Sequence, residues 1–527
     1  MKKIFSIILI CSGLLCSSCN DWLDILPNNE QVTDQYWKSK EDVEAVIASG
    51  YYYMRKAIPT MFHWGETRGG TLYTTATWSD GIHELQNFNL QPSAKICEYA
   101  SIYQVIGMAN SVLHYAAGVR SIDETYTEGA MRSHLTEAYF MRAYCHFLLV
   151  RNYREVPLVL EAFVTDESDY NLPKSTEAEI IAAIKNDLLT AIESGAAKTV
   201  YEEEWQTKGR VTKWALYALM ADVCLWDEDY DNAILYANMI LDAQDTFRPV
   251  FISDATKWFD IFYPGNSNES IFELNFDYIQ YSETNPLSGY FSYASTATSP
   301  YKLTERAVNV VQREAAEVIA AQGGVAPERV GRTLMAGVMY PAMVAPYSDY
   351  MRQTDLSVWK YWGTDVIDVN NYRENFDPNF IIYRVAEIIL IKAEALIMKG
   401  SEGSDEWKSA IALINQIRER AMLPILDELT LLEYSKLELL DVLLREREVE
   451  FIGEAKRWYD LLRIARKDNF AKEYKDYVIS LILEGNTTNK DEWIKSVLID
   501  NNAFYLPIPQ SEIDVNPNLI QNPYYAN

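Results

Sequence analysis

Carboxylates are the most abundant groups in this sequence that could perform catalysis. The chain carries 75 acidic residues, so carboxylate pairs of the kind that glycoside hydrolases use are inevitable, and no pair is evidence of a glycosidase. The five histidines form no H-E-x-x-H zinc motif, and the closest spacing, His134 to Glu137, lies on an apolar helical stretch that favours a structural role. No G-x-S-x-G motif or phosphate loop occurs. The sequence therefore predicts no catalytic residue, no metal site and no cofactor.

The densest run of opposite charges is Glu446–Arg463, EREVEFIGEAKRWYDLLR. Arg447 and Glu450 are three residues apart and Glu450 and Glu454 four apart, so on a helix they would be neighbours on one side. The apolar residues of the same run form a second side. Gly453 indicates a sharp joint between two helices. The pattern favours helix packing over a charged active site, and its simplest interpretation is a solvated charged face beside a core face.

Aromatic side chains are the second group with a chemical use. The chain has 36 tyrosines and 13 tryptophans, whose apolar faces and polar tips suit a wet binding surface. A sugar can pack its C–H face on such a ring while Asn, Asp or Arg bonds its hydroxyls. The best candidate for ligand contact is Trp78, with Asp80 behind it. The other candidates are Trp64, Tyr73, Tyr281, Tyr290, Tyr293, Trp359 and Trp362, and for each of these rings a core or loop-anchoring role is the alternative.

Length and charge narrow the class of protein. With 527 residues and 49% hydrophobic content, the chain can bury a large core and form more than one compact unit. Its net charge of −28 gives it no general attraction for nucleic acid or for anionic lipid.

The N-terminus reads as an export signal. Two lysines precede an apolar run, Ile4–Leu15, that is too short to span a bilayer. The following C-S-S-C resembles a bacterial lipobox, so we expect residues 1–18 to be a lipoprotein signal peptide, Cys19 to be lipidated and residues 19–35 to be a tether. Plain secretion with cleavage nearby is the alternative. The remaining cysteines lie in apolar helical contexts and are expected to be buried free thiols: Cys97, Cys145 and Cys224.

Helical periodicity covers most of the mature chain. Lys213–Asp227 and Tyr230–Ala243 form a helix pair that resembles a tetratricopeptide (TPR) unit, and the aspartates between them lack the Gly and Glu of an EF-hand. Further helices are predicted at Lys40–Arg55, Ile96–Ala117, Met131–Tyr153, Thr176–Ser194, Val308–Gln322, Arg384–Lys399, Glu406–Met422 and Thr430–Phe451. A strand is expected at Ser270–Asn275. Pro59–Pro92 and Phe247–Trp362 are predicted to be aromatic-rich irregular regions, and Phe504–Asn527 an extended strap.

Several blocks in order resemble the SusD/RagB family of outer-membrane lipoproteins. They are the Glu446–Arg463 run, Tyr383-Arg384-Val385-Ala386-Glu387 with Lys392-Ala393-Glu394-Ala395, Ile414-Asn415-Gln416-Ile417-Arg418, and Leu506-Pro507-Ile508-Pro509 through Gln521-Asn522-Pro523. The resemblance implies a mainly α fold: a TPR-like helical repeat frame, an α-α superhelix, with a loop-rich, aromatic-rich region and few short strands. It divides the chain into an N-terminal helical region, 36–245, and a C-terminal region, 246–527, with a loop-rich binding segment at 247–380.

The resemblance also implies a function. Such proteins are surface lipoproteins that bind glycans, or peptides in some members, and deliver them to a SusC-like TonB-dependent transporter in the outer membrane; they are not enzymes. A protein-only TPR scaffold and a surface glycosidase are the remaining alternatives. The aromatic loops argue against the scaffold, because a scaffold would use its concave helical face.

Overall fold

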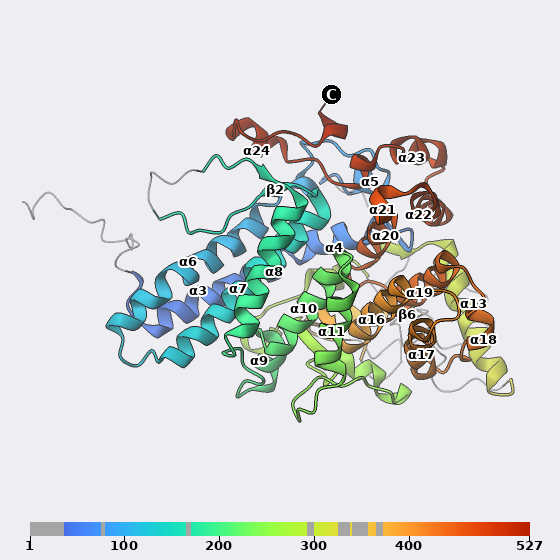
Figure 1. Ribbon diagram of the computed structural model, residues 1–527, viewed down its shortest axis with the longest axis horizontal. Helices are drawn as coiled ribbons and strands as arrows, with labels where there is room; N and C mark the ends of the chain where they lie inside the picture. Colours follow the sequence, from blue (N-terminus) through green and yellow to red (C-terminus); the bar gives the residue numbers. More distant parts are fainter. Residues whose placement is uncertain are drawn as a thin grey trace, which may run out of the picture.

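The structure is a computed structural model that describes residues 36–74, 80–164, 170–291, 300–324, 338–339, 357–364 and 373–526. It is mainly helical, as expected, and successive helices lie side by side from α3 at the left of Figure 1 to α19 at the right. The helices of the N-terminal part are α3 (Lys40–Lys56), α4 (Ile58–Glu66), α5 (Ile82–Gln86), α6 (Ala100–Ile122), α7 (Glu128–Tyr153), α8 (Glu177–Glu193), α9 (Glu204–Gly209), α10 (Lys213–Trp226) and α11 (Tyr230–Leu241).

The C-terminal part continues the array and then covers one end of it. Its helices are α12 (Tyr278–Tyr281), α13 (Glu305–Ala321), α16 (Val385–Lys399), α17 (Asp405–Arg420), α18 (Glu428–Leu431), α19 (Lys436–Glu450), α20 (Arg457–Ala465), α21 (Lys467–Phe470), α22 (Lys472–Glu484), α23 (Asp491–Val497) and α24 (Gln510–Val515). Helices α20 to α24 lie in the upper half of Figure 1, with α23 and α24 nearest the top. Short 3₁₀ turns are η2 (Lys95–Cys97), η3 (Ala255–Ile261), η4 (Pro286–Gly289), η5 (Trp359–Tyr361), η6 (Asn501–Phe504) and η7 (Pro523–Tyr525).

The strands of the described residues are short and pair two by two, all antiparallel. The pairs are β1 (Leu72–Thr74) with β5 (Tyr301–Leu303), β2 (Val156–Pro157) with β3 (Lys174–Ser175), β4 (Ser270–Leu274) with β8 (Phe380–Arg384), and β6 (Val338–Met339) with β7 (Ser357–Val358). The strand predicted at Ser270–Asn275 is therefore confirmed as β4. The pairs β1–β5 and β4–β8 tie together segments that lie far apart in the sequence, whereas β2–β3 and β6–β7 join neighbouring segments.

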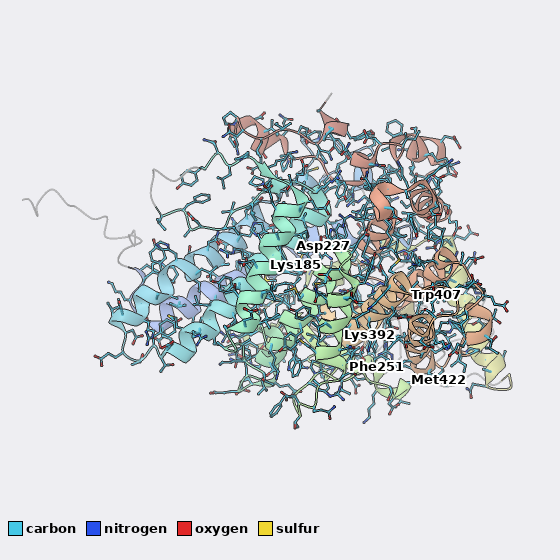
Figure 2. The ribbon with its side chains drawn as sticks, in the orientation of Figure 1. Lys185, Asp227, Phe251, Lys392, Trp407 and Met422 are labelled. Atoms are coloured by element: carbon cyan, nitrogen blue, oxygen red, sulfur yellow. The ribbon has the colours of Figure 1, made fainter. Side chains whose placement is uncertain are left out.

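Helix boundaries follow from local chemistry. The Thr176 side chain accepts a hydrogen bond from the backbone of Glu179, whose carboxylate accepts one in return from the Thr176 backbone, and this capping box begins α8. The same reciprocal arrangement begins α3 and α19. The predicted TPR-like pair is α10 and α11. Lys185 of α8 binds both Asp227 (2.6 Å) and Asp229 (3.1 Å) in the turn that joins them, and Figure 2 shows Lys185 beside Asp227.

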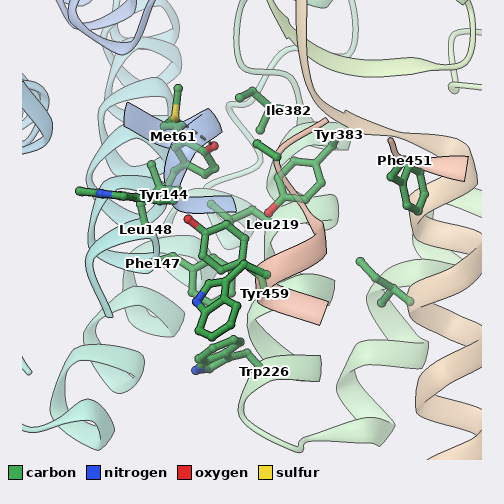
Figure 3. Close-up of a cluster of buried hydrophobic side chains, with 14 of the residues drawn as sticks. Met61, Tyr144, Phe147, Leu148, Leu219, Trp226, Ile382, Tyr383, Phe451 and Tyr459 are labelled. Atoms are coloured by element: carbon green, nitrogen blue, oxygen red, sulfur yellow. Dashed lines mark hydrogen bonds between the residues drawn. The ribbon is translucent and has the colours of Figure 1, made fainter. Parts of the chain in front are cut away.

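The hydrophobic core joins both parts of the chain. Figure 3 shows Tyr144, Phe147 and Leu148 of α7 facing Trp226 of α10 and Tyr459 of α20. Cys97, Cys145 and Cys224 are free and buried, as predicted. The C-terminal strap runs over the N-terminal helices, where the Leu506 amide donates to the carbonyl of Asn152 (2.7 Å). It is extended except for α24 and the 3₁₀ turns at its ends.

The prediction of one long irregular loop over Pro59–Pro92 was wrong. This stretch forms α4, β1 and α5. Pro59 lies in the first turn of α4, where a missing amide costs nothing. Gly65, which suggested a loop, instead permits close packing, because a Cβ there would lie 2.0 Å from the carbonyl oxygen of Ala455. The glycine marks a helix contact between distant parts of the chain.

The charged run Glu446–Arg463 forms α19 and α20, with Gly453 at φ 79° in the joint, as predicted. The expected solvated face was wrong, because the charged residues of this run are buried except Lys456. Besides the i,i+3 pair Arg463–Asp460 (2.9 Å) within α20, ion pairs of this run reach other elements: Arg384–Glu454 (2.9 Å), Arg384–Glu450 (2.7 Å), Arg447–Asp460 (2.8 Å), Arg457–Glu448 (3.2 Å) and Arg463–Glu394 (2.7 Å). The run therefore locks β8, α16, α19 and α20 together.

Candidate ligand-binding surface

A polar cluster around His63 joins α4 to β5 and to the residue after η4. His63 lies 2.6 Å by its Nδ1 from the Tyr301 hydroxyl and 3.2 Å by its Nε2 from the Tyr290 hydroxyl. The Thr67 hydroxyl lies 2.8 Å from that of Tyr301. The rings of His63 and Tyr290 are 5.2 Å apart between centroids. This cluster fixes Tyr290, one of the predicted ligand contacts, against the helical frame.

The electrostatics of this cluster keep it uncharged. Burial lowers the pKa of His63 to about 3, in spite of the opposing charge of Asp80. Burial and, after it, the charge of Asp80 raise the pKa of Tyr290 to about 12. His63 is therefore a neutral hydrogen-bonding group at physiological pH. Asp80 lies close enough to both side chains to influence them, although 16 residues separate it from His63 along the chain.

The two-stranded ribbon β1–β5 carries two further side chains of this surface, Tyr73 and Lys302. Tyr73 is paired directly with Lys302, while Leu72 and Thr74 on either side of Tyr73 are buried. Because side chains alternate along a strand and directly opposed residues share a face, Tyr73 and Lys302 lie together on the outer face of the ribbon. Both are partly exposed. The ribbon therefore offers an aromatic ring beside a cation.

Further hydrogen bonds brace the ribbon and bring Tyr290 to it. The Thr74 hydroxyl donates to the Pro300 carbonyl (2.8 Å), and the Thr74 amide donates to Gln86 of α5 (2.9 Å). The Tyr301 amide donates to the Tyr290 carbonyl (3.1 Å). Three predicted site residues, Tyr73, Asp80 and Tyr290, are thus brought into one region. Two others, Trp78 and Tyr293, lie outside the described residues.

Three predicted tryptophans belong to the core instead. Trp64 is fully buried and its Nε1 donates to the Ile96 carbonyl (2.9 Å). Trp359 and Trp362 are also buried, and the Trp362 indole donates to the carbonyl of Ser288. A ring with almost no exposed surface offers no face to a sugar. Lys360, next to Trp359, is buried too, and its ammonium group donates to the Glu454 carboxylate (2.5 Å).

The remaining candidate, Tyr281, lies on α12 and is 65% exposed. It stands on a different turn from the His63 cluster, nine residues before Tyr290. Its neighbour Tyr278 is also exposed.

Sequence reasoning missed three residues of this surface: His63, Tyr301 and Lys302. His63 had been weighed only as a member of a zinc motif, and no sequence signal marks a histidine that binds two tyrosines. Lys302 becomes relevant only because β5 pairs with β1, far away in the sequence. The turn between α22 and α23 was missed too: Asn486 and Thr487 line a small cavity of about 20 Å³ with Tyr73, which is room for water rather than for a sugar.

A second small cavity, of about 40 Å³, lies where the two parts of the chain meet. Its walls include Arg151, Asp222, Tyr383, Arg447 and Tyr459. It is too small for a sugar ring and belongs to the core around the residues drawn in Figure 3. Within the described ranges, no group of three or more His, Cys, Asp or Glu side chains is placed to hold a metal ion. In the same ranges, we find no helix with the length and apolarity needed to cross a membrane.

Comparison with known proteins identifies relatives of this chain by sequence and by fold. The model of the SusD family matches residues 351–525, and a model described as starch-binding associating with outer membrane matches residues 21–225. The SusD-like protein P38 of Formosa agariphila is 27% identical, over 88% of this chain and 92% of its own. A SusD-like protein of Bacteroides ovatus is 23% identical, over 98% of this chain and 97% of its own.

Solved structures share the architecture. A SusD superfamily protein from Bacteroides vulgatus superposes with a TM-score of 0.73 at 20% identity, covering 93% of this chain and all of that one. A laminarin-binding SusD-like protein gives a TM-score of 0.65 at 19% identity, covering 92% of this chain and 100% of its own. Matching models at both ends, relatives over nearly full length and the shared helical frame lead to one conclusion: this chain belongs to the SusD/RagB family.

Proposed function

We propose that this chain is a cell-surface lipoprotein that binds a poly- or oligosaccharide and delivers it to a SusC-like TonB-dependent transporter. The observation that carries the proposal is the grouping of Tyr73, Asp80, Tyr290 and Lys302 around the β1–β5 ribbon. An aromatic ring beside a carboxylate, a phenol and an ammonium group supplies stacking together with hydrogen bonds to hydroxyls. Trp78 and Tyr293 lie outside the described residues, and we keep them as proposed ligand contacts on the sequence argument alone.

The proposed function is binding without catalysis. At a pKa of about 3 the buried His63 ring is too weak a base to activate water at neutral pH, and at a pKa of about 12 the Tyr290 hydroxyl keeps its proton. Incubating the purified chain with a polysaccharide panel should release no reducing ends. Sustained product release that is lost in an Asp80→Asn variant would overturn this part of the proposal.

Binding can be tested by affinity electrophoresis and calorimetry against laminarin, starch, xylan, mannan and pectin. We expect at least one of these to bind, with weaker binding by Tyr73→Ala. The control is Tyr170→Ala. Tyr170 is exposed, and its ring centroid lies 4.7 Å from that of Phe163. Failure of every glycan together with binding to peptides would assign the chain to the peptide-binding branch of the family.

Anchoring and delivery are tested in the producing cell. We propose lipidation at Cys19 after removal of residues 1–18. A Cys19→Ala variant should leave the outer-membrane fraction and lose incorporation of labelled fatty acid. Purification of the full chain in mild detergent should bring down a large outer-membrane barrel; recovery of the lipoprotein alone, at native expression levels, would contradict the transporter partnership.

A further inference from the structure

A cluster of exposed aromatic side chains lies outside the site proposed above. Helix α12 exposes Tyr278 by 42%, Ile279 by 86% and Tyr281 by 65%. Trp205 of α9 is 54% exposed and Tyr52 of α3 is 45% exposed. Soluble proteins seldom leave such a set of large rings uncovered without a use.

Arg55 of α3 holds the turn that carries α12. Its guanidinium donates to the Asn275 carbonyl (2.9 Å) on one side of α12 and pairs with the Glu283 carboxylate on the other. The guanidinium carbon also lies 5.6 Å from the ring centroid of Phe276. Tyr52 is one helical turn before Arg55 and lies on the same side of α3. α3 is therefore joined directly to the residues on either side of α12.

Helix α9 is tied to the same turn. The Asn275 side chain donates to the carbonyl of Trp205 (2.7 Å). Gly209 packs so closely that a Cβ there would lie 2.5 Å from the Asn275 amide nitrogen. Both α9 and α3 pack on β4, the strand that leads into the turn. Tyr52, Trp205, Tyr278 and Tyr281 thus stand on one braced base, which we call the α12 platform.

The chemistry of the platform favours a neutral sugar chain. Tyr278 and Tyr281 are three residues apart, so their rings lie on one side of the turn. Rings on a braced base bind with little ordering cost, and the phenol groups add hydrogen-bond donors and acceptors. The nearby Arg55 and Glu283 charges neutralise each other. With a chain charge of −28, nothing here favours a polyanion.

The platform adjoins the proposed site along two separate segments. α3 passes through Ala57 into α4, and the backbone of Arg55 lies no more than about 20 Å from that of His63, given the rise of a helix and the reach of the residues between. The segment after α12 leads through η4 to Tyr290, nine residues beyond Tyr281.

We propose that the α12 platform is a second glycan-contacting surface, which holds the part of a neutral polysaccharide that extends beyond the β1–β5 ribbon. This inference rests on the proposed glycan function and adds to it a ligand class: a chain of many sugars rather than a mono- or disaccharide. It predicts that affinity increases with chain length and that the platform residues carry the increase.

The test is calorimetry with the size series, from the disaccharide to the polymer, of each panel glycan that binds the parent, beginning with laminari-oligosaccharides and malto-oligosaccharides. In whichever series binds, a Trp205→Ala/Tyr281→Ala variant should lose about fivefold or more in affinity for the long chains and nothing for the shortest bound member. Tyr73→Ala should weaken every length. Tyr170→Ala is the matched control and should change the affinity for neither long nor short chains. Because the replaced rings are exposed, the melting temperature should stay within a degree or two of the parent.

The outcomes separate the two proposals. If neither the series nor the wider glycan panel binds to the parent, the proposed function fails and the platform proposal with it. If the parent binds and the platform variant keeps full affinity for the longest chains, only the platform proposal is overturned. If the platform variant keeps full affinity for the longest chains but no longer co-purifies with the transporter in detergent, the platform proposal is also overturned. The rings would then form a contact with protein rather than with a glycan.

Discussion

Arg384 and Glu454 form a bidentate ion pair inside the protein, with Nε–Oε2 and Nη2–Oε1 both at 2.9 Å. Neither side chain is more than 1% exposed. Burial alone would raise the pKa of Glu454, but Arg384 and Lys360 together hold it below its ordinary value. The pair connects β8 to the joint between α19 and α20, and it explains why the charged run Glu446–Arg463 can be buried.

Breaking this pair should be costly. Glu454→Gln removes one charge and leaves Arg384 and Lys360 without their shared carboxylate, so we expect a loss of about 3 kcal/mol in the free energy of unfolding. Urea denaturation would measure it. Glu128→Gln is the control, since its pair with Arg120 is exposed and spans 3.4 Å, and it should change stability by less than about 0.5 kcal/mol. If the two substitutions lowered the free energy of unfolding equally, the buried ion pairs would not stabilise the fold more than an exposed pair does.

The ring of Tyr73 should matter more than its hydroxyl. Tyr73→Ala removes the stacking surface and should reduce glycan affinity by about 1 kcal/mol, roughly fivefold, whereas Tyr73→Phe should retain most of it. Calorimetry with the glycan that binds the parent measures both. A Phe variant as weak as the Ala variant would indicate that hydrogen bonding, not stacking, dominates at this position.

His146 should make the protein acid-sensitive. Its Nδ1 donates to the Arg142 carbonyl (2.9 Å) and its Nε2 accepts from the Val159 amide (3.3 Å), so the folded state needs the neutral ring. Burial lowers its pKa from 6.5 to about 4. The unfolded state therefore binds the extra proton between these values, and stability present above pH 6.5 is lost as the pH falls toward 4.

The comparison with His146→Gln isolates this contribution. The stability advantage of the parent over the variant should shrink by about 2 kcal/mol between pH 7 and pH 5. Thermal or urea unfolding across that range provides the measurement. A difference that stays constant with pH would show that His146 is not the titrating group.

Glu66 should have the opposite pH dependence. It is buried at the end of α4, its Oε1 accepts from the Ala455 amide (2.8 Å), and burial raises its pKa from 4.5 to about 8. The folded state keeps the proton that the unfolded state releases above pH 4.5, so stability falls as the pH rises from 4.5 toward 8.

A Glu66→Gln variant keeps the acceptor and removes the titration. Relative to this variant, the parent should lose about 3 kcal/mol between pH 4.5 and pH 7.5. Parallel unfolding curves at the two pH values would show it, and a parent that gains stability relative to the variant over this range would contradict a protonated Glu66.

Local signals in the sequence were sufficient to locate most of the helices. The capping box at Thr176, the joint at Gly453 and the buried thiols were all predictable, because they depend on residues within a few positions or on residue type. The family blocks also carried the fold class. The boundaries of α4 were missed because Pro59 and Gly65, which often mark loops, here begin a helix and allow it to pack closely.

Tertiary structure alone decided which aromatic rings are available and which charges pair. Trp64, Trp359 and Tyr281 are all aromatic residues in stretches predicted to be irregular. The first two are buried in the core and Tyr281 is exposed. Arg384 pairs with Glu454, 70 residues away in the sequence, and His63 is hydrogen-bonded to Tyr301, 238 residues away. Such contacts depend on the packing of whole elements, which no local pattern encodes. The sequence by itself thus determined the helices and the family, and packing determined the surface proposed to meet a ligand.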